Sequence, residues 1–168
     1  MIITNGKIVT WGDPNEILED RALLIQDGMI QEIGTEAVLK AAHPSEEILD
    51  AQGQMVMPGL ICAHTHFYGA FSRGMAIPGE PARNFQEILA NLWWKLDKGL
   101  DEEGGKYSAL ALLADATRYG CTTLFDHHAS PNCIDGSLDI EADAVQESGL
   151  RASLCYEVTD RDGEEKAL

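Results

Sequence analysis

Hydrophobic and polar residues alternate in short runs over the first part of the chain, a pattern typical of β-strands. Residues 2–10 are predicted to form a hairpin that turns at Asn5-Gly6. Residues 23–33 are predicted to form a second hairpin that turns at Asp27-Gly28. Both dipeptides favour the tight two-residue turns that join antiparallel strands. The pattern therefore predicts a β-rich beginning.

A short helix is expected after Thr35, and Pro44 is expected to end it. Ala37, Val38 and Ala41 are expected on one side of this helix. Residues 48–50 and 54–57 have the composition of two further short strands. Residues 1–57 are thus predicted to be a small β-rich domain.

From Pro58 onward, continuous apolar runs replace the alternation and predict buried strands at residues 60–66, 121–125 and 150–156. Between them, apolar residues recur at helical spacing. The predicted helices cover residues 85–96, 101–120 and 137–148. Strands that alternate with helices are typical of parallel βαβ units, so residues 58–168 are predicted to be an α/β domain.

Composition excludes several classes of partner. The chain has 168 residues and a net charge of −16 without a basic cluster, so binding to nucleic acid or to an anionic membrane is not expected. The apolar runs are far shorter than the ~20 residues of a membrane span, and the start lacks the features of a secretion signal. Four cysteines without a Cys-x-x-Cys pair suit a reducing cytoplasm, the expected location.

His64 and His66 lie at the end of the first predicted strand of the α/β domain. In a strand, residues two apart point to the same face, about 6.5 Å apart along the chain. Two imidazoles so placed can bind one metal ion, although histidines at a strand end also simply pack. Cys62 has the same parity, so it is expected on the same face, as a third ligand or as a small packed thiol.

Polar residues also follow the other two predicted strands. Asp126, His127 and His128 come after the second strand, and Glu157 follows the third. In parallel α/β folds, active sites are built at the carboxyl ends of the strands. The sequence therefore predicts that these polar residues and the histidine pair share one site.

The run Pro-Gly-Leu-Ile-Cys-Ala-His-Thr-His at residues 58–66 resembles the first-strand motif of the amidohydrolase superfamily. The resemblance is to the branch of atrazine/triazine hydrolases and guanine-type deaminases, and residues 126–131 and 155–163 are most similar to SsnA-type aminohydrolases. It implies a (β/α)₈ TIM-type barrel with a small β-sandwich, of which residues 1–57 would be the N-terminal part. It also implies His64 and His66 as metal ligands, with zinc favoured and iron as the alternative.

The same resemblance implies a metal-dependent hydrolase that acts on C–N bonds of a nitrogen heterocycle or an amidine-like small molecule, with the metal supplying hydroxide. The family's other ligands, two histidines and an aspartate, and its acid/base residue would lie on later strands, and no histidine follows His128. A barrel of this type needs ~250 residues, whereas about 110 follow Met57. We therefore expect an N-terminal portion holding three β/α units, inactive alone and dependent on the missing portion or on oligomerisation. No catalytic residue is assigned within it.

Two alternatives stay open: a non-catalytic or partner-dependent module, and a cyclic amidohydrolase instead of a deaminase. The expected substrate contacts are Phe67, Tyr68, Arg73, Trp93, His128 and Glu157. Several of them can equally have a structural or surface role, since Trp93 fits a helical core stripe, Arg73 can pair with a surface acid and Glu157 can be solvated. His127 and His128 alternate sides, and His128 is expected to face the site. Asp126 can equally cap the following loop.

Overall fold

The computed structural model describes residues 1–166. The chain divides into two compact units, Met1–Pro58 and Gly59–Leu168. The boundary lies at the Pro-Gly step where the hydrophobic pattern changes. Each unit has its own sheet and its own buried cluster, and each is described by itself below.

The first unit is a five-stranded sheet in the order β3-β2-β1-β4, with β5 also pairing with β1. Its strands are β1 (Ile2–Val9), β2 (Ile17–Gln26), β3 (Met29–Gly34), β4 (Ile48–Asp50) and β5 (Met55–Val56). The helix α1 (Glu36–Ala42) follows β3 at the predicted position. Its buried residue is Leu39, which joins Ile2 and Leu24 in the core, whereas Val38 is 56% exposed. The residues Ala37, Val38 and Ala41 are exposed, and Leu39 is the residue of this helix in the core.

Of the two predicted hairpins, one is confirmed. Asp27 and Gly28 both have positive φ angles of 51° and 73°, and they join β2 to the antiparallel β3. The first hairpin is wrong, because β1 continues through Asn5-Gly6 with an irregular register against β2. Gly6 instead allows a close approach of β5, since a Cβ at this position would lie 2.6 Å from the Val56 side chain.

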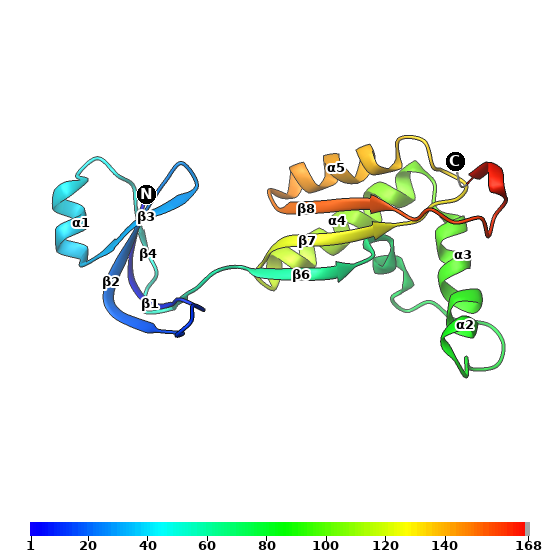
Figure 1. Cartoon of the computed structure of the whole chain (residues 1–168), viewed down its shortest axis with the longest axis horizontal. Helices are drawn as coiled ribbons and strands as arrows, with labels where there is room; N and C mark the ends of the chain where they lie inside the picture. Colours follow the sequence, from blue (N-terminus) through cyan, green and yellow to red (C-terminus); the bar gives the residue numbers. More distant parts are fainter. Residues whose placement is uncertain (167–168) are drawn as a thin grey trace. The chain divides into compact units, whose positions relative to one another are not determined.

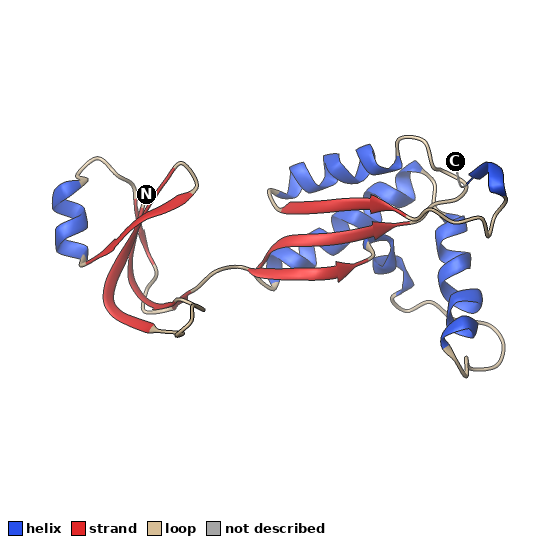
Figure 2. Cartoon of the chain, in the orientation of Figure 1, coloured by secondary structure: helices blue, strands red, loops and turns tan. Residues whose placement is uncertain are grey.

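The second unit contains a parallel sheet in the order β6-β7-β8, and the three arrows point in one direction (Figure 2). The strands are β6 (Leu60–Thr65), β7 (Cys121–His128) and β8 (Arg151–Tyr156). The helices α4 (Glu102–Arg118) and α5 (Ser137–Ser148) connect them (Figure 1). The Asp101 side chain caps α4 by accepting a hydrogen bond from Gly104 N, 2.7 Å away. The predicted alternation of parallel strands and helices is confirmed.

The predicted helix at residues 85–96 forms as a series of short pieces. These are α2 (Phe85–Ile88), the π-helical turn η2 (Leu89–Trp93), α3 (Trp94–Leu96) and the 3₁₀ turn η3 (Asp97–Gly99). Two further 3₁₀ turns are η1 (Phe67–Ser72), directly after the histidine strand, and η4 (Glu164–Lys166). None of the helices within residues 1–166 is long and apolar enough to span a membrane.

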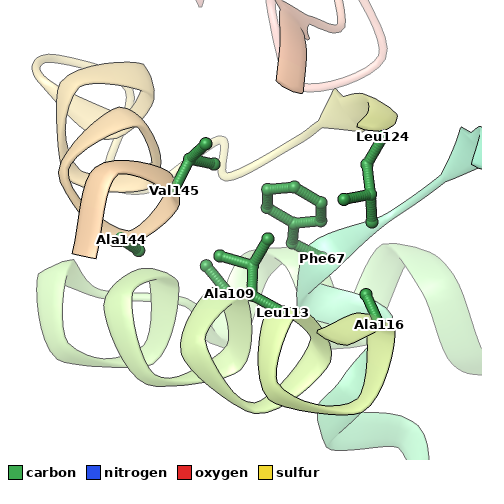
Figure 3. Packing of buried hydrophobic residues seen from close by; sticks show 7 residues of the cluster. All are labelled: Phe67, Ala109, Leu113, Ala116, Leu124, Ala144 and Val145. Atoms are coloured by element: carbon green, nitrogen blue, oxygen red, sulfur yellow. The ribbon is translucent and has the colours of Figure 1, made fainter. Parts of the chain in front are cut away.

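The core of the second unit lies between the sheet and the helices α4 and α5. Figure 3 shows the ring of Phe67 among Leu113 of α4, Val145 of α5 and Leu124 of β7. Phe67 and Leu113 are fully buried. The sheet face away from these helices carries exposed apolar side chains, with Ile61 65% exposed and Phe125 46% exposed. This uncovered face also carries the histidine pair.

Candidate metal centre

A β-bulge in β6 determines which residues face the site. Cys62 pairs with Leu124 and Thr65 pairs with Asp126, so three steps along β6 match two steps along β7. The extra residue reverses the alternation of side chains. Cys62 therefore packs against the buried cluster that contains Leu124, on the helix side of the sheet. The expectation that Cys62 shares the face of His64 and His66 is wrong, because it assumed a regular strand.

The two histidines converge at this bulge, with His64 inside the irregular segment and His66 just after it. The Nε2 atoms of His64 and His66 are 3.1 Å apart, which allows both to reach one ion at the ~2.1 Å distance typical of zinc. His66 Nδ1 lies 2.8 Å from the carbonyl oxygen of His127. A carbonyl oxygen only accepts, so Nδ1 carries the hydrogen and Nε2 keeps its lone pair for a metal. The donor set therefore fits a divalent transition metal.

Burial favours the state of His66 that binds metal. Desolvation lowers the pKa of His66, and the His127 carbonyl opposes this only in part. A lowered pKa keeps the imidazole neutral near neutral pH, the form in which histidine is a ligand. The hydrogen bond to the His127 carbonyl therefore leaves Nε2 of His66 free for a metal, and burial keeps the ring neutral.

Aromatic rings surround His66. The ring of Trp93 lies 5.6 Å away, that of Tyr68 5.8 Å and that of His127 5.4 Å between centroids. Trp93 packs closely on η1, where a Cβ at Gly69 would lie 3.3 Å from the indole. Burial raises the pKa of Tyr68, so its hydroxyl stays protonated. Trp93 and Tyr68, both predicted substrate contacts, are therefore neighbours of the histidine pair and also part of its packing.

An open cavity of about 410 Å³ lies at this end of the sheet. It is lined by Ala63, His64, Thr65, His66, Phe125, Asp126, His127, Ser153 and Cys155. A larger hollow of about 740 Å³ lies in the first unit, among charged surface residues such as Lys7 and Glu19. The lining of that hollow contains no histidine or cysteine, so we place the candidate chemistry at the smaller cavity.

Of the two adjacent histidines at the end of β7, His127 faces the cavity and His128 does not. His127 lines the cavity, whereas His128 is 1% exposed and lies on the opposite side of β7. His128 Nδ1 contacts Glu141 Oε1 at 2.7 Å, and its Nε2 lies 3.0 Å from Ser130 Oγ. The expectation that His128 faces the site is therefore wrong, and His127 has that position.

Sequence reasoning missed Glu141, which completes a buried triad with Asp126 and His128. The possible ligand atoms of the three residues all lie within 4.8 Å of one another. Burial, and next the charge of Glu141, raise the pKa of Asp126 to about 8. Asp126 does not cap the following loop but accepts a hydrogen bond from Phe67 N at 2.6 Å. The signal for Glu141 was its spacing, since it lies on α5 between the buried Ser137 and Ala144.

Other predicted substrate contacts have structural partners. Phe67 is fully buried in the core and does not line the cavity. Arg73 pairs with the exposed carboxylate of Asp115. Glu157 pairs with Arg161 Nε at 3.1 Å and also lies outside the cavity lining. The structure thus brings the rings of His64, His66, Trp93 and Tyr68 together, whereas the side chains of Phe67, Arg73 and Glu157 have the other partners named above.

Comparison with known proteins identifies relatives of this chain. Residues 55–168 match the model of the amidohydrolase family. A 5-methylthioadenosine/S-adenosylhomocysteine deaminase of Pyrococcus furiosus is 34% identical over 99% of this chain and 36% of its own length. An 8-oxoguanine deaminase of Pseudomonas aeruginosa is 33% identical over 79% of this chain and 29% of its own length. The chain thus spans about a third of the length of these relatives.

Solved structures show the same fold at lower identity. E. coli guanine deaminase superposes with a TM-score of 0.79 at 20% identity, covering 99% of this chain and 39% of that one. Atrazine chlorohydrolase TrzN from Arthrobacter aurescens, complexed with zinc and atraton, gives a TM-score of 0.76 at 23% identity, covering 92% and 35%. With the family match extending over most of the sequence, including the histidine strand, the chain belongs to the amidohydrolase family.

Proposed function

We propose that this chain supplies His64 and His66 as the first two metal ligands of a hydrolytic deaminase acting on a nitrogen heterocycle or an amidine-like small molecule. The observation that carries the proposal is the convergence of the two Nε2 atoms at 3.1 Å, with His66 held by the His127 carbonyl. The deaminase names of the relatives support the reaction class. An 8-oxoguanine deaminase among them supports a heterocyclic substrate.

Zinc is the metal we propose, because neutral imidazoles suit it and a structural neighbour was solved with zinc. When bound, such a metal lowers the pKa of a water molecule toward ~7 and so makes hydroxide available at neutral pH. Within this chain, the role of the histidines is to hold the ion. The role of the His127 carbonyl is to keep the proton of His66 on Nδ1.

For substrate contact, the strongest candidates are the side chains beside the histidines. Trp93 lies 5.6 Å from His66, and we propose that its indole contacts a flat heterocycle bound at the histidines, although it does not itself line the cavity. The His127 side chain and Phe125 line the cavity and can contact the same ligand. Tyr68 is 4% exposed, so we propose that it supports the His66 ring and does not touch the substrate.

We further propose that the 168-residue chain binds metal but does not turn over substrate by itself. Two imidazoles leave a zinc site incomplete, and the matched relatives are about three times as long. The exposed Ile61 and Phe125 on the uncovered sheet face would need cover from the remaining portion or from another chain. The free cysteines are consistent with our further proposal of a cytoplasmic location.

Metal analysis and an ammonia-release assay test the proposal together. We expect the purified chain to bind zinc, and the His64→Ala/His66→Ala variant to lose it. A protein that contains this chain and has the full length of its relatives should release ammonia from a purine, pyrimidine, triazine or guanidino compound. Ring opening of a cyclic amide without ammonia would favour the cyclic amidohydrolase. Equal metal content in wild type and the double variant would support a non-catalytic module.

A further inference from the structure

His66 is held from two directions by one short segment of β7. Its ring donates to the carbonyl of His127 at 2.8 Å, and the next backbone amide, Phe67 N, donates to the Asp126 carboxylate at 2.6 Å. Both acceptors come from adjacent residues at the end of one strand. The position of this strand end therefore determines both the rotation of the His66 ring and the path of the backbone that follows it.

The strand end itself is anchored by the buried triad. The side chains of Asp126 and His128, on either side of His127 in the sequence, both reach Glu141 of α5. All three triad residues are at most 3% exposed. His128 is fixed further by Ser130 Oγ, which in turn donates to the Cys133 carbonyl at 2.7 Å. The peptide that carries the His127 carbonyl is thus held by anchors at both neighbours.

We propose that the buried triad Asp126–His128–Glu141 is a positioning device that fixes His66 in its metal-binding orientation and tautomer. This inference rests on the proposed function only in taking His66 as a ligand. None of the triad side chains touches the metal or the substrate. They act through the His127 carbonyl and Phe67 N, because buried hydrogen bonds of this kind keep a ligating imidazole in one orientation.

The side-chain chemistry suggests a graded set of variants. Asp126→Ala removes the acceptor for Phe67 N and the contact with Glu141. Asp126→Asn can keep both, since its amide oxygen can accept from Phe67 N while its NH₂ group can donate to Glu141. Asp97→Ala is the matched control, because Asp97 is also a buried carboxylate, 1% exposed, but pairs with Arg161 at 2.6 Å.

The experiment measures zinc affinity of the 168-residue chain by competition with a chromophoric chelator. Loss of a direct hydrogen-bonded partner of a metal ligand typically weakens metal binding about 10–100-fold. Because Asp126 bonds the backbone next to His66 and not its ring, we expect Asp126→Ala to weaken zinc binding by about 10-fold, the low end of this range. Asp126→Asn should restore affinity to within about threefold of wild type, and Asp97→Ala should leave it unchanged. If Asp126→Ala binds zinc as tightly as wild type, the inference is wrong.

A second measurement does not depend on zinc or on the folding of a variant. Long-range ¹⁵N–¹H spectra of the metal-free wild type report the tautomer of His66 directly. We expect hydrogen on Nδ1, and hydrogen on Nε2 would overturn the inference. A second zinc equivalent that Glu141→Gln abolishes would also overturn it, because the triad would then be a metal site. If wild type binds zinc no better than the His64→Ala/His66→Ala variant, the proposed function fails, while the tautomer result still tests the contact between His66 and the His127 carbonyl through which the triad would act.

Discussion

Replacing Phe67 by alanine tests whether this residue is a core residue or a substrate contact. Its side chain is fully buried among Leu113, Leu124 and Val145. A buried phenylalanine removes about 150–250 Å² from water, worth about 4–6 kcal/mol at ~25 cal/mol per Å². Because some burial persists in the unfolded chain and alanine keeps its Cβ, we expect a loss of about 3–5 kcal/mol in the free energy of unfolding.

The assay is urea unfolding followed by tryptophan fluorescence in a Trp11→Phe background. The remaining tryptophans, Trp93 and Trp94, both lie in the second unit, so the signal reports that unit alone. Phe85→Ala is the matched control, because Phe85 is 69% exposed and should lose no more than about 0.5 kcal/mol. A Phe67→Ala chain as stable as this control would refute the core assignment.

Three further predictions concern the same unit. Gly59→Ala should lower the free energy of unfolding by about 1–3 kcal/mol, because the new Cβ would overlap the side chain of Thr122. Adding Thr122→Gly should restore most of the loss, and an unchanged urea midpoint for Gly59→Ala would contradict this close packing. Because the pKa of Asp126 is raised to about 8, the native state binds more protons than the unfolded state between about pH 4 and pH 8. The contribution of this group to the free energy of unfolding should therefore fall as the pH rises through that range. Asp126→Asn should flatten that slope in urea midpoints measured across the range, and identical slopes would count against a raised pKa. Arg161→Leu should cost about 3–5 kcal/mol by leaving buried Asp97 unpaired, and Asp97→Asn in the same chain should recover part of it; without any recovery the ion pair would not be the cause.

Local signals predicted much of the fold, because they depend on residues close in sequence. The Asp27-Gly28 turn, the helix α5 and the alternation of strands and helices all follow from such signals. Asn5-Gly6 carries the same turn signal but lies inside β1, where Asn5 has a positive φ of 52°. The residues before it pair with β4 and those after it pair with β5, so the strand continues through the irregularity. Partners distant in sequence decided that position.

The histidine pair could be predicted because residues two apart in a strand point to the same face, and the side chains of His64 and His66 do converge. The face of Cys62 could not, since it depends on an extra residue in β6 that only the pairing with β7 reveals. At the end of β7, the fully buried face carries Asp126 and His128, while the apolar Phe125 is exposed. Polarity therefore indicates the wrong face there, and the position of His127 could not be predicted from the sequence.

Whether His64 and His66 bind one metal ion is tested most directly by X-ray absorption at the zinc edge of the zinc-loaded chain. We expect scattering from two imidazoles with Zn–N distances near ~2.0–2.1 Å. We expect no sulfur near ~2.3 Å, because Cys62 faces the core and the Cys155 thiol donates to the Asp126 carbonyl oxygen. The imidazole signal should disappear in the His64→Ala/His66→Ala variant. A zinc site with sulfur ligands, or an imidazole signal that survives in that variant, would contradict the assignment of the two histidines as the metal ligands.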